Sequence, residues 1–161
     1  MGKKYNRIKA MEYARKWAYK RNPKYYNFDS VGGDCTSFVS QCLYAGAEIM
    51  NYKKHVGWYY INGNNKSPSW TGVEFLCDFL IKNKGIGPSA NITHKENIEI
   101  GDIIQLRFYN MPRFSHSLFV VGRQEEIYVA SHTDDSYYRN LNTYYYEEIR
   151  YLHINNNVKI Y

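Results

Sequence analysis

The chain has 161 residues, enough for one domain with a sizeable core, and we expect residues 1–161 to form a single domain. Its 44% hydrophobic and 22% charged residues exclude a disordered or fibrous protein. The net charge of +6 favours anionic partners, but the basic residues form no single long block, so we expect no nucleic-acid partner.

The cysteine spacing and the distribution of apolar residues argue against disulfide-rich, metal-binding and membrane-spanning classes of protein. The three cysteines (Cys35, Cys42 and Cys77) have neither the number for a disulfide framework nor C-x-x-C spacing. We therefore expect no structural metal site and no cofactor. No apolar run marks a signal peptide or a membrane span. The sequence leaves open whether the protein acts inside the cell, is exported by another route or has been trimmed.

The first third of the chain predicts two helices. Residues 5–21 place apolar side chains at helical spacing on one side and lysines and arginines on the other. Pro23 ends this helix, and an aromatic segment then leads to Gly32 and Gly33. Residues 35–45 carry no charge and few polar groups, so we expect the second helix to be buried.

The remainder predicts one more helix and then a sheet. A loop-like segment, 51–68, precedes a helix that starts near Thr71 with capping-box spacing and ends before Gly85. Five runs then have strand character: 103–108, 116–121, 127–132, 137–141 and 149–154. Helices followed by antiparallel strands predict an α+β fold.

The glycine turn before the second helix indicates a reactive cysteine. Two glycines allow a sharp turn, and Asp34 is a good N-cap residue. Cys35 then lies on the first helical turn, where free amides and the helix dipole favour the thiolate, the reactive form. Cys42 lies seven residues later and is interpreted as core packing.

The five histidines are the candidates for a base that accepts the Cys35 proton. If strands 116–121 and 127–132 form a hairpin centred on Gln124, His116 lies directly across from His132, on the same face. His116 could then accept the thiol proton while His132 orients its ring. A β-bulge in the hairpin would shift this register by one residue, and Asp134 is the alternative orienting group.

The residues that carry this pattern resemble a bacterial amidase-domain family of the papain-like clan, related to NlpC-type and CHAP-type cell-wall peptidases. The resemblance extends to about residue 135. It rests on Tyr5-Asn6-Arg7, on Gly32-Gly33-Asp34-Cys35-Thr36-Ser37-Phe38-Val39-Ser40-Gln41-Cys42-Leu43, on Ser69-Trp70-Thr71-Gly72, on Gly101-Asp102-Ile103-Ile104-Gln105, on His116-Ser117 and on Ser131-His132-Thr133.

The resemblance implies a papain-like fold, in which the nucleophile helix packs on an antiparallel sheet or half-barrel. It implies Cys35 as nucleophile, His116 as base and His132 as the third catalytic residue. Asp34 matches a position that can contact a substrate amine. Ser37 departs from the family pattern, which has asparagine or glycine there. The implied substrates are amide or peptide bonds of peptidoglycan, so the expected site of action is the bacterial cell wall.

Two functions therefore compete. The first is a cysteine amidase or peptidase acting through Cys35, His116 and His132, with Trp70 lining the substrate groove; an aromatic residue there is as often a core plug. The second is a non-catalytic, basic and tyrosine-rich module that binds a cell-wall or other anionic polymer. The oligomeric state, the export route and the bond cleaved are not predicted.

Overall fold

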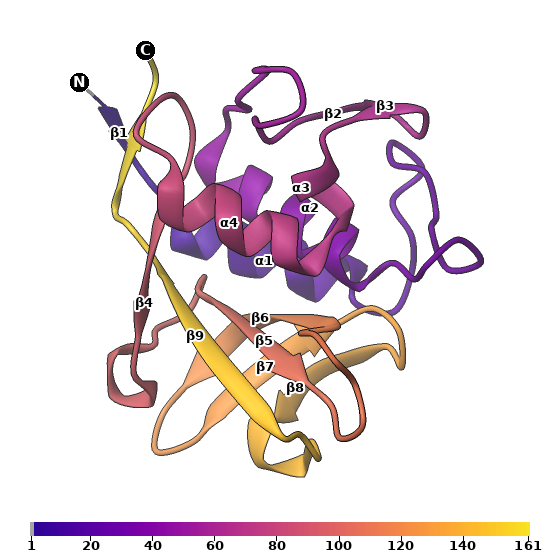
Figure 1. The fold of residues 1–161 in the computed structure, drawn as a ribbon. Helices are drawn as coiled ribbons and strands as arrows, with labels where there is room; N and C mark the ends of the chain where they lie inside the picture. Colours follow the sequence, from indigo (N-terminus) through magenta and orange to yellow (C-terminus); the bar gives the residue numbers. More distant parts are fainter. Residues whose placement is uncertain (1) are drawn as a thin grey trace.

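The computed structural model describes residues 2–161 and stacks a layer of helices on a strongly twisted sheet (Figure 1). The helices are α1 (Arg7–Trp17), α2 (Cys35–Ala47), α3 (Pro68–Thr71) and α4 (Val73–Lys82). The strands are β1 (Gly2–Lys4), β2 (Tyr60–Asn62), β3 (Asn65–Lys66), β4 (Ala90–Thr93), β5 (Ile103–Arg107), β6 (His116–Arg123), β7 (Ile127–Ser131), β8 (Ser136–Asn140), β9 (Glu148–Ile154) and β10 (Asn157–Lys159). Short 3-10 helices span Lys95–Asn97 and Leu141–Thr143.

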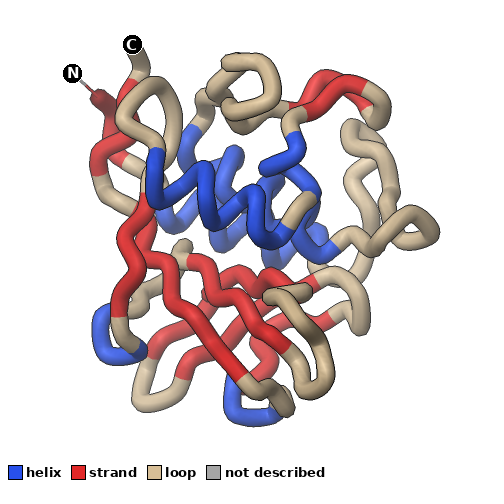
Figure 2. Tube along the Cα trace, viewed as in Figure 1, coloured by secondary structure: helices blue, strands red, loops and turns tan. Residues whose placement is uncertain are grey.

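The main sheet has six strands in the order β4-β9-β5-β6-β7-β8, and every neighbouring pair is antiparallel. The strand β9 enters between β4 and β5, although it follows them by more than forty residues. Two smaller pairs, β1–β10 and β2–β3, lie apart from this sheet (Figure 2). This arrangement confirms the α+β fold class; the sequence did not predict β1 to β4 or β10.

The helix α2 is the buried centre of the molecule. Its residues from Cys35 to Leu43 are all buried, as the absence of charge predicted. Alternating side chains of β6 point to opposite faces of the sheet. Phe119 and Val121 face the helical layer and join Phe38 in the larger core, whereas Leu118 forms a second core on the other side of the sheet.

Two of the sequence motifs meet in a buried ionic cluster that joins the layers. Asp102, which is fully buried, accepts hydrogen bonds from Arg7 Nη1 and His153 Nδ1, each at 2.8 Å. It also accepts one from the backbone amide of Ile154 at 2.9 Å. The Tyr5 hydroxyl donates to the carbonyl of Gly101 at 2.8 Å. This cluster therefore ties the start of α1 to β5 and β9.

The hairpin register differs from the prediction. Phe119 pairs with Ala130, one residue away from the expected alignment, and the register shifts again between Val120 and Gly122. The irregularity is a bulge beside Gly122, where the ring of Tyr138 packs so closely that a Cβ would lie 2.7 Å from it. On the β7 side, this register does not place His116 opposite His132; on the β5 side, His116 pairs with Leu106.

Among residues 2–161, none of the helices has the length and apolar character needed to cross a bilayer.

Candidate active site

The turn before α2 has the backbone geometry that the two glycines predicted. Gly32 and Gly33 have φ angles of 83° and 95°, in the left-handed region that glycine tolerates best. A Cβ at Gly33 would lie 3.4 Å from Thr133 Oγ1, so the turn is packed against the loop that follows β7. Cys35 is the first residue of α2. The turn thus brings the cysteine to the end of the sheet that carries His116.

The Cys35 side chain is nearly enclosed, with 9% of its surface exposed. Its sulfur lies 3.7 Å from Thr36 Oγ1 and near the backbone amides of Ser117 and Thr36. Burial raises the pKa of the thiol above 9.0, and the nearby amides lower it by less. This differs from the expected low pKa, because desolvation of the thiolate outweighs the helix N-terminus. Ser117 directly follows His116, so the sulfur lies beside the start of β6.

The ring of His116 is held by Ser131, a residue that the sequence analysis did not select. His116 Nε2 lies 3.1 Å from Ser131 Oγ, and this hydroxyl donates its hydrogen to the carbonyl of His132 at 2.8 Å. When the Ser131 hydroxyl donates to this carbonyl, its oxygen accepts from His116, and we assign the ring hydrogen to Nε2 on this basis. Within residues 2–161, Nδ1 of His116 has no hydrogen-bond partner, and no hydrogen bond joins it to Cys35.

The surroundings of His116 keep its imidazole neutral. Only 6% of the residue is exposed, and the rings of Phe108 and Tyr144 lie 5.8 and 6.2 Å from its ring. Burial and, secondarily, the positive charge of Arg139 lower the pKa of His116 from 6.5 to about 4. The ring therefore has a free lone pair on Nδ1 at neutral pH and can act as a proton acceptor.

His132 does not orient His116, contrary to the expectation. Its Nδ1 lies 2.6 Å from Asp34 Oδ2, and its Nε2 lies 2.8 Å from the carbonyl oxygen of Trp17. The ring also stacks on Phe38 at a centroid distance of 3.9 Å. Both nitrogens are thus engaged away from His116. The physical reason is the shifted register, since a slip of one residue replaces His132 by Ser131 on the face toward His116.

Asp34 forms a buried structural contact and does not cap α2 with its side chain. It is 1% exposed, and its Oδ1 accepts the backbone amide of Phe28 at 2.9 Å while Oδ2 faces His132. Arg21 Nε lies 3.8 Å from the same carboxylate. These groups enclose the carboxylate, so it is not open to a substrate amine in this conformation. It ties the glycine turn to the end of β7 instead.

Two other candidate residues form no hydrogen bond with His116 or Cys35 within residues 2–161. Asp134, the alternative orienting group, is 88% exposed at its side chain and pairs with Arg139 at 3.3 Å. Trp70 is fully buried, and its ring lies 5.0 Å from that of Trp58 and 5.8 Å from that of Tyr25. Trp70 is thus part of the hydrophobic core and does not line a groove.

A polar network fixes the first turn of α2 on the sheet. Thr36 Oγ1 and Ser117 Oγ are 2.9 Å apart, and Gln105 Nε2 donates to the same serine at 3.1 Å. Arg150 Nε in turn donates to Gln105 Oε1 at 2.8 Å. These contacts connect α2 with β5, β6 and β9 and set the position of Cys35 relative to His116. No cluster of three or more potential metal ligands exists among residues 2–161.

The fold and these contacts define an α+β protein with a cysteine at the start of a buried helix and a histidine on the adjacent strand. Residues 4–154 match the family described as "Putative amidase domain", and the chain belongs to this family.

Two relatives come from Bacillus subtilis (strain 168). The "Uncharacterized protein YhbB" is 33% identical over 123 residues, which cover 75% of this chain and 38% of that protein. The "Uncharacterized protein YjcM" is 29% identical over 139 residues, covering 81% of this chain and 31% of that protein. The chain thus spans well under half the length of these relatives. No solved structure matches it.

Proposed function

We propose that the protein is a papain-like cysteine hydrolase of amide or peptide bonds, with Cys35 as nucleophile and His116 as general acid and base. The observation that carries this proposal is the position of the Cys35 sulfur at the amide of Ser117, the residue after a histidine whose Nδ1 is unoccupied. The membership in an amidase family supports the same reaction class.

The reaction starts from a neutral thiol and a neutral imidazole. This follows from burial, which raises the pKa of Cys35 and lowers that of His116 to about 4. His116 Nδ1 accepts the thiol proton as the sulfur attacks the amide carbonyl. The carbonyl π electrons move onto oxygen and form a tetrahedral intermediate. When the C–N bond breaks, His116 returns the proton to the leaving amine and a thioester remains. Water then attacks this thioester, regenerates the Cys35 thiol and releases the acid.

The start of α2 supplies the groups that would stabilise the oxyanion. As the first residue of the helix, Cys35 has a backbone amide with no partner inside α2. This amide and the positive end of the dipole of a 13-residue helix favour negative charge on the carbonyl oxygen. In this scheme Ser131 acts as a positioning residue, since it holds the His116 hydrogen on Nε2 and leaves Nδ1 for the thiol.

We propose peptidoglycan as the substrate and the cell wall as the site of action, following the resemblance to NlpC-type and CHAP-type peptidases. The alternative is a binding module without catalysis. The raised pKa of Cys35 favours this alternative, because a buried thiol is usually inert.

The decisive experiment compares Cys35→Ala with Cys77→Ala in the digestion of purified peptidoglycan. Release of new amino groups is measured, and mass spectrometry identifies the products. Cys35→Ala should lose about a thousandfold or more of the activity, because the nucleophile is absent. Cys77→Ala removes another thiol outside the site and should retain activity. Equal activity of the wild type and Cys35→Ala would contradict cysteine catalysis.

A further inference from the structure

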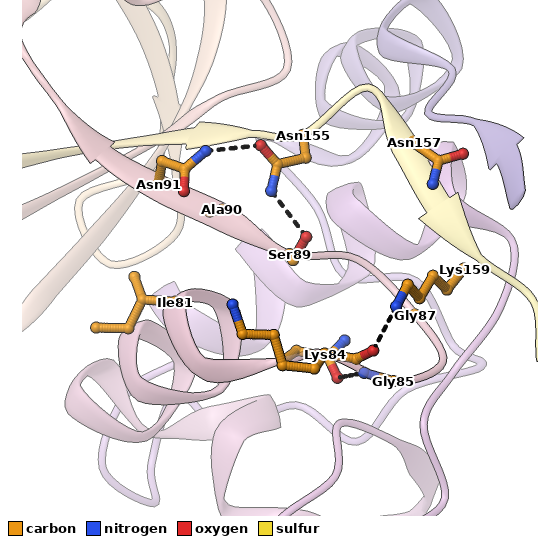
Figure 3. Close-up of a pocket in the computed structure, with 11 residues that line it drawn as sticks. Ile81, Lys84, Gly85, Gly87, Ser89, Ala90, Asn91, Asn155, Asn157 and Lys159 are labelled. Atoms are coloured by element: carbon orange, nitrogen blue, oxygen red, sulfur yellow. Dashed lines mark hydrogen bonds between the residues drawn. The ribbon is translucent and has the colours of Figure 1, made fainter.

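Two cavities far from Cys35 share one wall. The larger, of about 580 Å³, lies between residues 51–57, which follow α2, and the outer face of α4. The smaller, of about 320 Å³, lies between residues 83–87 and the chain around β4, β9 and β10 (Figure 3). Residues 83–85 line both cavities. Because α2 has 13 residues, the loop at its end is about 20 Å from Cys35 at its start.

The two cavities carry a concentrated positive charge, and together we name them the lysine groove. The lysines that line it are Lys53, Lys82, Lys84 and Lys159. Asp78 is the single carboxylate among the lining residues, so the groove holds half of the chain's net charge of +6. The Lys82–Asp78 contact, at 3.9 Å between side chains that are 74% and 60% exposed, neutralises little.

Most arginines of the chain are neutralised by carboxylates, unlike the lysines of the groove. Those paired with carboxylates are Arg7, Arg21, Arg107, Arg139 and Arg150. In the lysine groove, Lys159 turns back to donate to the carbonyl of Lys84 at 2.7 Å, and Lys84 reaches into the smaller cavity (Figure 3). The ammonium groups are thus spread along the groove and are available to a ligand.

The walls of the lysine groove are held by side-chain amides. Asn51 Nδ2 donates to the carbonyl of Ile86 at 2.9 Å, and Asn83 Nδ2 donates to Ile86 and Pro88 at 3.0 and 2.8 Å. Mutual backbone hydrogen bonds between Asn51 and Trp58, at 2.9 and 2.7 Å, close the loop on the other side. A ligand therefore meets a preformed groove, and its binding need not order these segments.

We propose that the lysine groove binds a linear, phosphate-bearing polyanion. Lysines offer single point charges, whereas an isolated carboxylate is better held by an arginine fork, which the lining residues lack. The exposed apolar side chains of Val56 and Phe75 suit the aliphatic links between phosphates. A nucleic-acid strand would stack its bases on several aromatic rings, and the lining offers only Phe75 and the imidazole of His55 as exposed rings.

This inference goes beyond the proposed amidase function, because the wall formed by residues 51–57 and Cys35 lie at opposite ends of α2. The loop after α4, at the upper left of Figure 1, is on the other side of the molecule from the purple loops that precede α2. A polymer held in the lysine groove would keep the protein on its target without occupying the candidate active site.

The test measures binding of short-chain linear polyphosphate by isothermal titration calorimetry at low salt. The groove variant is Lys82→Glu/Lys84→Glu, and the matched control is Lys16→Glu/Lys20→Glu, which makes the same charge change at exposed lysines beside Trp17. The groove variant should bind about tenfold more weakly or worse, and the control less than about twofold. Lys53→Glu, on a separate segment, should also weaken binding. Thermal melts verify that each variant is folded.

Several results would overturn the proposal. The first is the absence of polyphosphate binding by the wild type. The second is an equal loss of binding in the groove and control variants, because such a loss would reflect net charge alone. Polyglutamate of matched charge should bind more weakly than polyphosphate, and equal binding would contradict a preference for phosphate. Tighter binding of oligodeoxythymidylate that depends on Phe75 would assign the groove to nucleic acid. Cys35→Ala should bind polyphosphate like the wild type, and a loss there would contradict a separate site.

Discussion

His116 and His132 are both buried, with 6% and 1% of their surface exposed, and both lie near the start of α2. Their hydrogen bonds separate them. His132 uses both ring nitrogens, on Asp34 and on the carbonyl of Trp17, whereas His116 uses only Nε2, on Ser131. A histidine with two occupied nitrogens joins segments together, while one with a free nitrogen can transfer a proton. The number of occupied ring nitrogens thus favours proton transfer for His116 and a structural role for His132, whereas the sequence predicted that His132 orients His116.

The largest expected effect is the loss of activity in His116→Ala. Without the proton acceptor, amide hydrolysis should fall by about a thousandfold or more. The free energy of unfolding should fall by less than in His132→Ala, because within residues 2–161 the His116 ring makes a single side-chain hydrogen bond. Steady-state hydrolysis and urea unfolding measure the two quantities. An active His116→Ala protein would contradict the role of His116 as proton acceptor.

His132→Ala should show the opposite balance. It leaves the buried carboxylate of Asp34 without its imidazole partner, which should lower the free energy of unfolding by about 3 kcal/mol. Urea unfolding of His132→Ala, Asp34→Asn and the double variant forms a double-mutant cycle. Strong coupling is expected, since the two side chains are 2.6 Å apart. Additive effects would show that the pair does not act as a unit.

The burial of His116 should also give stability a pH dependence. Burial lowers the pKa of His116 to about 4, so between pH 6.5 and 4 the unfolded chain binds the proton that the folded chain excludes. Stability from this group is complete above pH 6.5 and is lost as the pH falls, by at most about 3 kcal/mol. His116→Gln should remove this slope in urea unfolding. An identical acid slope in the variant would assign it to other groups.

The smallest of these effects concerns Ser131→Ala. This variant lets the His116 hydrogen move to Nδ1, so kcat should fall by about 10 to 100-fold with little change in KM. Nitrogen-15 NMR of the imidazole should report the changed tautomer, which a purely structural role would not alter. Ser67→Ala, at a buried hydroxyl that donates to the carbonyl of Tyr59, is the matched control. An unchanged tautomer would contradict the positioning role.

Local patterns predicted the parts of the molecule that local chemistry determines. The glycine turn, the uncharged α2 and the strands β5 to β9 follow from residue types and spacing. The register of β6 and β7 could not be predicted, because its bulge depends on the packing of Tyr138 against Gly122. The Asp34–His132 contact joins residues 98 positions apart, so no spacing rule indicates it. Ser131 was missed for the same reason, since one residue of register decides which side chain faces His116.

The central position of β9 also constrains the order in which the protein can assemble. Its seven residues, Glu148–Ile154, separate β4 from β5, and both earlier strands hydrogen-bond to it. During synthesis, β4 and β5 therefore emerge with edges that stay unpaired until β9 has been made. Between the synthesis of β5 and that of β9, the nascent chain carries open strand edges that expose it to aggregation.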